Sequence, residues 1–229
     1  MMQSAYRAFS YFGLMSIMAA LLWGFRYDSR AAWSGYLFDI AIYGAWATVH
    51  LVMTRPWFKH AAYGARAGAP IERQVFIGVT VTTWLLVLWY HRPLPGGAIA
   101  VAEPVRFAAM VGFLWSVFAF FEGVPFGAID GLLGVPGAAM SHSHGTETPL
   151  LTEGRYAAIR HPQYQAVMLA GLCSLLIHFN VAQALWCLMI GGTFILFIPI
   201  EEAQLSAARG DAYRAYMQKT PWRLVPGLW

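Results

Sequence analysis

The sequence predicts an all-α, polytopic integral membrane protein with about six transmembrane helices and an amphipathic C-terminal helix at the membrane surface. Three observations predict this fold: 59% of the 229 residues are hydrophobic, 11% are charged, and the mean hydropathy is +0.52. Such values are typical of multi-span membrane proteins and lie outside the range of soluble domains. A nucleic-acid partner is not expected, because the basic residues are scattered at the ends of apolar segments.

Six apolar segments are candidates for crossing a bilayer. Each one is bounded by charged residues, Pro or Gly, as membrane spans usually are. The fifth segment is short, so we expect its helix to begin before Gln165, inside the polar cluster that precedes it. A cleaved signal peptide is not expected, since the end of the first segment has no small-residue cleavage site. The segments cover residues 9–25, 35–53, 75–90, 105–121, 165–177 and 181–200.

The distribution of Lys and Arg predicts the orientation. With six spans, four basic residues lie on one side, and cytoplasmic loops carry the basic excess. The other side holds both termini and a larger set: Arg7, Arg55, Lys59, Arg66, Arg73, Arg155, Arg160, Arg209, Arg214, Lys219 and Arg223. Both termini and the candidate active site described below are therefore expected to be cytoplasmic.

We predict that a reporter fused after Trp229 scores as cytoplasmic, because the basic asymmetry places the C-terminus on that side. A fusion that scores as periplasmic or luminal would contradict this orientation and the cytoplasmic site with it.

The chain is expected to form one membrane domain, residues 1–229. Its first four spans, residues 1–121, are expected to form the substrate side, and residues 148–229 the cofactor-binding hairpin and tail. Between them lies a loop, residues 122–147, which is rich in Gly, Pro and Ala. His142 and His144 in this loop have a spacing that metal ligands can have, but no Cys or third His accompanies them. We therefore expect a polar loop and no metal site.

Two polar clusters flank the last helical hairpin. Arg160-His161-Pro162-Gln163-Tyr164 precedes one apolar segment, and Glu201-Glu202 follows the next. Because a hairpin returns to the same side of the membrane, the two clusters are expected to meet there. Pro162 suits the first turn of a helix, whose free N–H groups favour an anionic ligand group, and Arg160 adds a positive charge. The alternative is that the first cluster only anchors its helix at the headgroups.

The acidic pair is costly beside hydrocarbon unless it meets cations, hydrogen-bond donors or water. A ligand with an ammonium group and hydroxyls would satisfy both carboxylates. The alternative is that one glutamate pairs with Arg160 while the other faces water. Farther on, Leu205, Tyr213 and Tyr216 predict an amphipathic helix, interrupted at Gly210, that lies on the membrane surface and covers the site.

These motifs resemble those of the membrane methyltransferase superfamily. That group holds isoprenylcysteine carboxyl methyltransferases, phospholipid methyltransferases, and NnrU-like and methanethiol S-methyltransferase-like proteins. The shared order is Thr-x-Gly-x-Tyr-x-x-x-Arg-His-Pro-x-Tyr, a helical hairpin, Glu-Glu-x-x-Leu and Gly-x-x-Tyr-x-x-Tyr, within about residues 148–226. Upstream, residues 50–59, 71–73 and 89–93 are similar to the NnrU-like and methanethiol S-methyltransferase-like branch.

The resemblance implies S-adenosylmethionine as the cofactor, bound between the hairpin and the segment before it. With such a cofactor, His161 and Tyr164 are expected to be contacts rather than proton-transfer groups, because a sulfonium methyl donor is already activated by its charge. By position, the implied cofactor-binding residues are Pro149, Leu150, Leu151, Tyr156, His161, Pro162 and Tyr164, with Glu201 or Glu202 taking a hydroxyl or ammonium group.

Two residues are candidates for a catalytic role, Arg160 and His50. Without such a role, His50 is expected to be a core histidine, and Arg55, Lys59 and Arg73 are expected to be cytoplasmic charges that flank the spans.

The expected acceptor is a small thiol or a lipidic molecule, with membrane lipids as the surrounding partners. The prenylcysteine enzymes carry an Arg where Phe197, Ile198 and Pro199 stand here, so a prenylcysteine is not the expected acceptor. Phospholipid or amine N-methylation is an alternative. A different class of function is a haem-binding, NnrU-like protein, either an isomerase or one related to nitrogen oxides. The candidate axial ligands for that function are His50, His142, His144 and His178.

Overall fold

The computed structural model describes residues 2–23, 25–64, 70–122, 129–133, 135 and 150–229. Within these ranges the regular structure is helical and no β-strand forms, which confirms the predicted all-α class. The helices are α1 (Met2–Trp23), α2 (Ser34–Met53), α3 (Pro56–Tyr63), α4 (Pro70–Tyr90), α5 (Glu103–Glu122), α6 (Ile129–Leu132), α7 (Arg155–Ala158), α8 (Pro162–Ile177), α9 (Val181–Arg209) and α10 (Asp211–Lys219).

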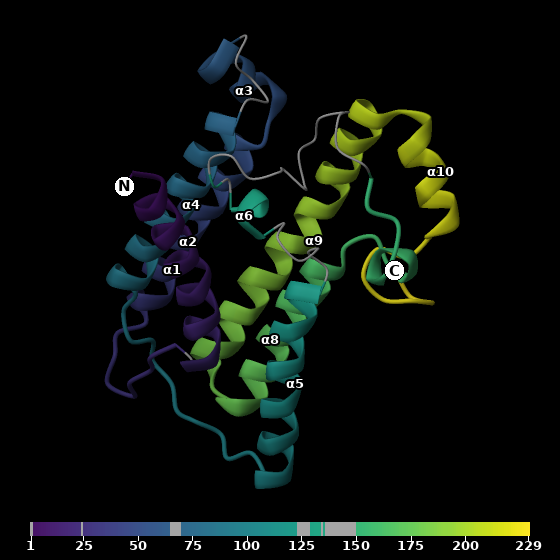
Figure 1. Cartoon of the computed structure of the whole chain (residues 1–229). Coiled ribbons are helices and arrows are strands. Elements are labelled where there is room, and N and C mark those ends of the chain that lie inside the picture. Colours follow the sequence, from purple (N-terminus) through teal and green to yellow (C-terminus); the bar gives the residue numbers. More distant parts are fainter. Residues whose placement is uncertain (1, 24, 65–69, 123–128, 134, 136–149) are drawn as a thin grey trace.

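Five helices in the described part of the chain are long and apolar enough to cross a membrane: α1, α2, α4, α5 and α9. The shorter apolar helix α8 has 16 residues. In Figure 1 these helices, taken in chain order with α8 included, alternate in direction. The N-terminus and the end of α9 therefore lie at the same end of the bundle. The prediction of about six membrane helices is confirmed. Which end faces the cytoplasm stays a prediction.

The membrane helices present large apolar side chains on their outer faces. On α5 the side chains of Phe107, Leu114 and Phe118 are all exposed. A row of such residues is unfavourable in water and is what a helix facing lipid requires.

The last two long helices differ in their bounds from the apolar segments of the sequence. Helix α8 begins at Pro162, inside the polar cluster, as predicted. Helix α9 does not end at residue 200 but continues through Pro199 and both glutamates to Arg209. Adjacent residues of a helix point about 100° apart. The two carboxylates therefore face different neighbours.

The membrane helices pack in two groups. Helix α4 packs against both α1 and α2, whereas α5 packs along α8, which in turn packs on α9 (Figure 1). The two groups meet around the buried Trp186 of α9. Its ring stacks on Phe25 at a centroid distance of 4.1 Å and meets Tyr43 of α2 and Trp84 of α4 edge-on. The fourth predicted span thus packs with the hairpin rather than with the first three.

Polar contacts close the bundle at the end near residues 25 and 91. The buried side chain of Asp39 lies 2.5 Å from His91 Nδ1, and the backbone N–H of Arg26 donates to His91 Nε2 at 3.2 Å. Nε2 therefore acts as an acceptor, and Nδ1 carries the hydrogen that Asp39 accepts. The backbone N–H of Phe25 donates to Gln183 of α9 at 3.0 Å. The bonds of His91 join α1, α2 and α4 at this end, and the bond from Phe25 to Gln183 joins this group to α9.

We predict that Gly13→Ala destabilises the protein by about 1–3 kcal/mol, the usual cost of overpacking. A Cβ atom at Gly13 of α1 would lie 2.4 Å from Val81 Cγ2 of α4, and a β-branched side chain in a helix has little rotamer freedom to yield. Thermal unfolding in detergent measures the effect. Gly44→Ala is the matched control, because a Cβ there meets no atom within 4 Å. Equal losses in both variants would contradict the close α1–α4 contact.

Candidate active site

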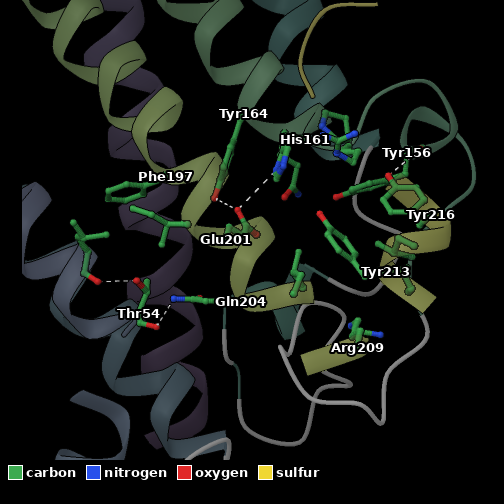
Figure 2. A pocket seen from close by; sticks show the side chains of 18 of the residues that line it. Thr54, Tyr156, His161, Tyr164, Phe197, Glu201, Gln204, Arg209, Tyr213 and Tyr216 are labelled. Carbon is green, nitrogen blue, oxygen red and sulfur yellow. Dashed lines mark hydrogen bonds and ion pairs between the residues drawn. The ribbon is translucent and has the colours of Figure 1, made fainter. Parts of the chain in front are cut away.

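A cavity with a volume of about 260 Å3 lies at the end of the bundle where the N-terminus of α8 meets α9 and α10. Figure 2 shows Tyr156, Tyr213 and Tyr216 on one side of it and Phe197 on the other, with Tyr164 and Glu201 between them. The lining residues are His50, Leu51, Thr54, Arg73, Phe76, Leu150, Leu151, Tyr156, residues 160–164, Phe197, Ile200, Glu201, Gln204, Leu205, Arg209, Tyr213 and Tyr216.

Most of the site residues that the sequence predicts lie around this one cavity. Glu202 does not line it and is buried behind it. Pro149 lies outside the described residues, as do His142 and His144. The predicted residues that line the cavity are His50, Leu150, Leu151, Tyr156, Arg160, His161, Pro162, Tyr164 and Glu201.

Glu202 is the centre of a buried ion-pair cluster. Arg160 Nε donates to its Oε1 at 2.7 Å, and Arg223 Nε donates to its Oε2 at 2.9 Å. His161 Nε2 lies 3.2 Å from Oε1. Only 7% of the Glu202 and Arg160 side chains is exposed, so the cluster is not a headgroup anchor. It joins the start of α8, the end of α9 and the C-terminal tail.

Glu201 is the glutamate that faces the cavity. Its side chain is 32% exposed, and its Oε2 accepts a hydrogen bond from the Tyr164 hydroxyl at 2.6 Å. His161 Nδ1 lies 3.8 Å from the same oxygen. The sequence left open whether both carboxylates meet a ligand or one pairs with Arg160. The structure has the second arrangement, with Glu202 paired to Arg160 and Glu201 left at the cavity.

The C-terminal segment folds back over the cavity through a turn at Gly210. This residue has a φ of 57°, a left-handed conformation that favours glycine, and it separates α9 from α10 as predicted. Tyr213 and Tyr216 of α10 are buried, and the Tyr216 hydroxyl donates to the backbone carbonyl of Tyr156 at 2.8 Å. Helix α10 therefore covers the site, as predicted.

The three tyrosines of this wall are neutral groups. Burial raises the pKa of Tyr156 above its ordinary value, and the nearby Glu201 carboxylate raises it further. Burial and both glutamates raise the pKa of Tyr213 in the same way, and burial raises the pKa of Tyr216 to about 12. At neutral pH these phenols therefore remain protonated. They provide aromatic surface and hydrogen-bond donors rather than bases.

The opposite wall includes a residue that the sequence reasoning missed. Arg73 was expected to be a flanking charge, but it is half-buried and lines the cavity. The sequence held one indication of this position: Arg73 and Phe76 are three residues apart, which places both side chains on the same face of a helix. The guanidinium carbon lies 5.6 Å from the centroid of the Phe76 ring. Gln204 of α9 also lines this part and donates to the Thr54 carbonyl at 3.2 Å.

Two of the histidines suggested as haem ligands, His50 and His178, lie within the described residues and do not come together. His178 Nε2 lies 2.7 Å from the Leu22 carbonyl, so this nitrogen is a donor and is not free to bind iron. His50 stacks against Phe197, far along α9 from the turn that contains His178. By the rise of a helix, about 24 Å of α9 separates Val181, beside that turn, from Phe197. His50 and His178 therefore cannot bind the same haem.

Comparisons with known proteins find two relatives of this chain. The chain is similar to "Methanethiol S-methyltransferase 1" of Bradyrhizobium diazoefficiens, with 27% identity over 206 residues that cover 82% of this chain and 67% of the relative. It is also similar to "Methanethiol S-methyltransferase" of Mycobacterium tuberculosis, with 25% identity over 197 residues that cover 80% and 77%. The resemblance to membrane methyltransferases is confirmed. No protein-family model matches the chain, and no solved structure does.

We predict that Glu201 and Glu202 respond differently to replacement by Gln. Glu202→Gln should lower the free energy of unfolding by about 2–4 kcal/mol, because the buried guanidinium of Arg160 and its neighbour Arg223 lose their counter-charge. Glu201→Gln should leave stability nearly unchanged but raise the dissociation constant of S-adenosylhomocysteine about tenfold. Thermal unfolding and calorimetric titration separate the two effects. Equal stability losses, or unchanged affinity in Glu201→Gln, would contradict this division of roles.

Proposed function

We propose that this protein is a membrane methyltransferase that transfers the methyl group of S-adenosylmethionine to a small thiol. The observation that carries the proposal is the cavity, where the Glu201 carboxylate and a wall of neutral tyrosines face an aromatic wall that includes Phe197. The two relatives named methanethiol S-methyltransferase support the thiol as the acceptor class.

The residues of the cavity fit the proposed cofactor. S-adenosylmethionine is a zwitterion with an additional sulfonium charge, and it carries an apolar adenine ring. Glu201 suits its ammonium or hydroxyl groups, and the tyrosine rings suit the sulfonium through cation–π attraction. Leu150 and Leu151 offer apolar contacts for the adenine ring. The N-terminus of α8 favours the carboxylate of the cofactor.

In this proposal the protein holds the reactants and excludes water. The bound cofactor supplies a methyl group that its sulfonium charge has already activated. Glu201 and Tyr164, joined by their 2.6 Å hydrogen bond, orient the donor, while α10 closes the cavity over it. Both ring nitrogens of His161 face the glutamates, at 3.8 Å and 3.2 Å. This arrangement supports a positioning role for His161 rather than proton transfer to or from the acceptor.

The acceptor side is assigned to α2 and α4. The residues that these helices contribute, among them His50 and Phe76, are mostly aromatic or apolar, and α5 contributes none of the described lining. The cavity is small for a site that must hold a cofactor and an acceptor together. A small acceptor therefore suits it better than a phospholipid or a prenylated cysteine.

We predict that the purified protein in detergent converts ethanethiol and S-adenosylmethionine into the methyl thioether and S-adenosylhomocysteine in equal amounts. Mass spectrometry of both products measures the reaction, and a titration with S-adenosylhomocysteine measures binding. Glu201→Gln should lower kcat/KM about tenfold, by the same weakening of cofactor binding predicted above. A protein that binds no S-adenosylhomocysteine and shows a Soret band at stoichiometric haem would overturn the proposal in favour of the haem-binding alternative.

A further inference from the structure

Three aromatic side chains close the cavity at its inner end, toward the middle of the bundle. Among the lining residues in the described ranges, His50 comes first along α2, Phe197 comes first along α9, and Phe76 comes last along α4. Helices α2 and α9 run toward the cavity end of the bundle and α4 runs away from it (Figure 1), so each of these residues lies deepest on its helix. These three residues form the aromatic end wall.

The rings of the aromatic end wall are held by contacts with one another and with α4. The His50 ring lies parallel to the Phe197 ring, at an interplanar angle of 7° and a centroid distance of 5.8 Å, and its centroid is 4.6 Å from that of Phe76. Its Nδ1 lies 3.2 Å from the Thr80 hydroxyl, which fixes the rotation of the imidazole. Rings packed in this way have little freedom to move aside for a ligand. The end wall is therefore a fixed boundary of the cavity.

Phe197 links the aromatic end wall to the residue assigned to the cofactor. It precedes Glu201 by four residues on α9, which places both side chains on one face of the helix, about 6 Å apart along its axis. Figure 2 shows Tyr164 and Glu201 between Phe197 and the tyrosines of the other side. A donor held at Glu201 therefore leaves only a short space before the Phe197 ring.

We propose that Phe197 sets the length of the acceptor: its ring ends the acceptor side of the cavity, so that short alkyl thiols fit and longer ones are excluded. This inference rests on the proposed methyltransferase function. The thiol sulfur points toward the cofactor, and the alkyl chain lies against the aromatic end wall, which offers it apolar contact. Phe197 is thus a specificity-determining residue, and it takes no part in moving a proton.

The boundary at Phe197 gives selectivity for a physical reason. An alkyl chain that reaches the ring must either displace a packed aromatic side chain or leave its sulfur out of line with the methyl group. One extra or missing methylene in an apolar pocket changes kcat/KM about 10–200-fold. Replacing the ring by a methyl group opens space that additional methylenes can fill, and their burial then favours longer thiols.

A role for Phe197 in packing alone predicts a different result. The ring stacks on His50, so its truncation removes packing and lowers stability whether or not an acceptor touches it. Such a loss would lower the rates with all thiols by the same factor. The ratio of kcat/KM for a long thiol to that for a short thiol therefore distinguishes a specificity-determining residue from a packing residue.

The first test compares ethanethiol with hexanethiol as acceptors for the full-length protein in one detergent. Phe197→Ala should raise the ratio of kcat/KM for hexanethiol to that for ethanethiol about tenfold or more. Phe197→Leu keeps part of the apolar volume, so it should raise the ratio less, and it carries the test if Phe197→Ala does not fold. Leu196→Ala is the matched control, since Leu196 is 68% exposed and does not line the cavity. An unchanged ratio in the folded Phe197 variants, or an equal rise in Leu196→Ala, overturns the proposal.

The second test measures binding without turnover. Hexanethiol is titrated calorimetrically into protein saturated with S-adenosylhomocysteine, and the same detergent in every titration makes the partition of the thiol into micelles equal for all variants. Phe197→Ala should bind hexanethiol about tenfold more tightly than the wild type. The affinity for S-adenosylhomocysteine should stay within about twofold, because the bond between Tyr164 and Glu201 is intact. Equal hexanethiol affinity in the wild type and the folded Phe197 variants overturns the assignment of Phe197 to the acceptor.

The outcomes also separate this inference from the function on which it rests. Wild-type protein that methylates hexanethiol with a kcat/KM at least as high as that for ethanethiol overturns the length limit alone. Wild-type protein that binds S-adenosylhomocysteine but transfers no methyl group to either thiol overturns the proposed function, and the length limit with it.

Discussion

The buried charge cluster around Glu202 is the interaction on which the geometry of the site depends. One carboxylate accepts from Arg160 and Arg223 and meets His161, which ties three segments far apart in the sequence. Separating these charges at low dielectric is costly, so the start of α8, the end of α9 and the tail keep one mutual arrangement. The cavity walls carried by these segments are positioned as a consequence. Glu202 therefore acts through the structure rather than by contact with a ligand.

The cavity lies where the two helix groups meet, and each group contributes a different chemistry. The group of α8 and α9, with α7 and α10, contributes the carboxylate of Glu201 and a wall of tyrosines. The group of α2 and α4 contributes His50 and Arg73 within aromatic surroundings. Trp186 and the bonds of Gln183 hold the two groups together away from the cavity. In the proposed reaction, donor and acceptor are held by separate groups of helices.

The general fold could be predicted from the sequence because hydropathy and length alone select membrane helices. The start of α8 at Pro162 was also predictable, since proline fits only the first turn without loss of a hydrogen bond. The end of α9 was not, because Pro199 and two charges resemble a helix end. Helix α9 continues past them because Glu202 is neutralised by contacts from other segments, which no local pattern records.

The sequence by itself determined the membrane helices and the order of the motifs around the last hairpin, because these depend on local composition and spacing. Only the tertiary structure decided which glutamate faces the cavity. Glu201 and Glu202 are identical in type, and helix rotation together with the position of Arg160 distinguishes them. Arg73 follows the same rule: beside Glu72 at a helix start it resembles a flanking charge, and packing of α4 against its neighbours turns it to the cavity.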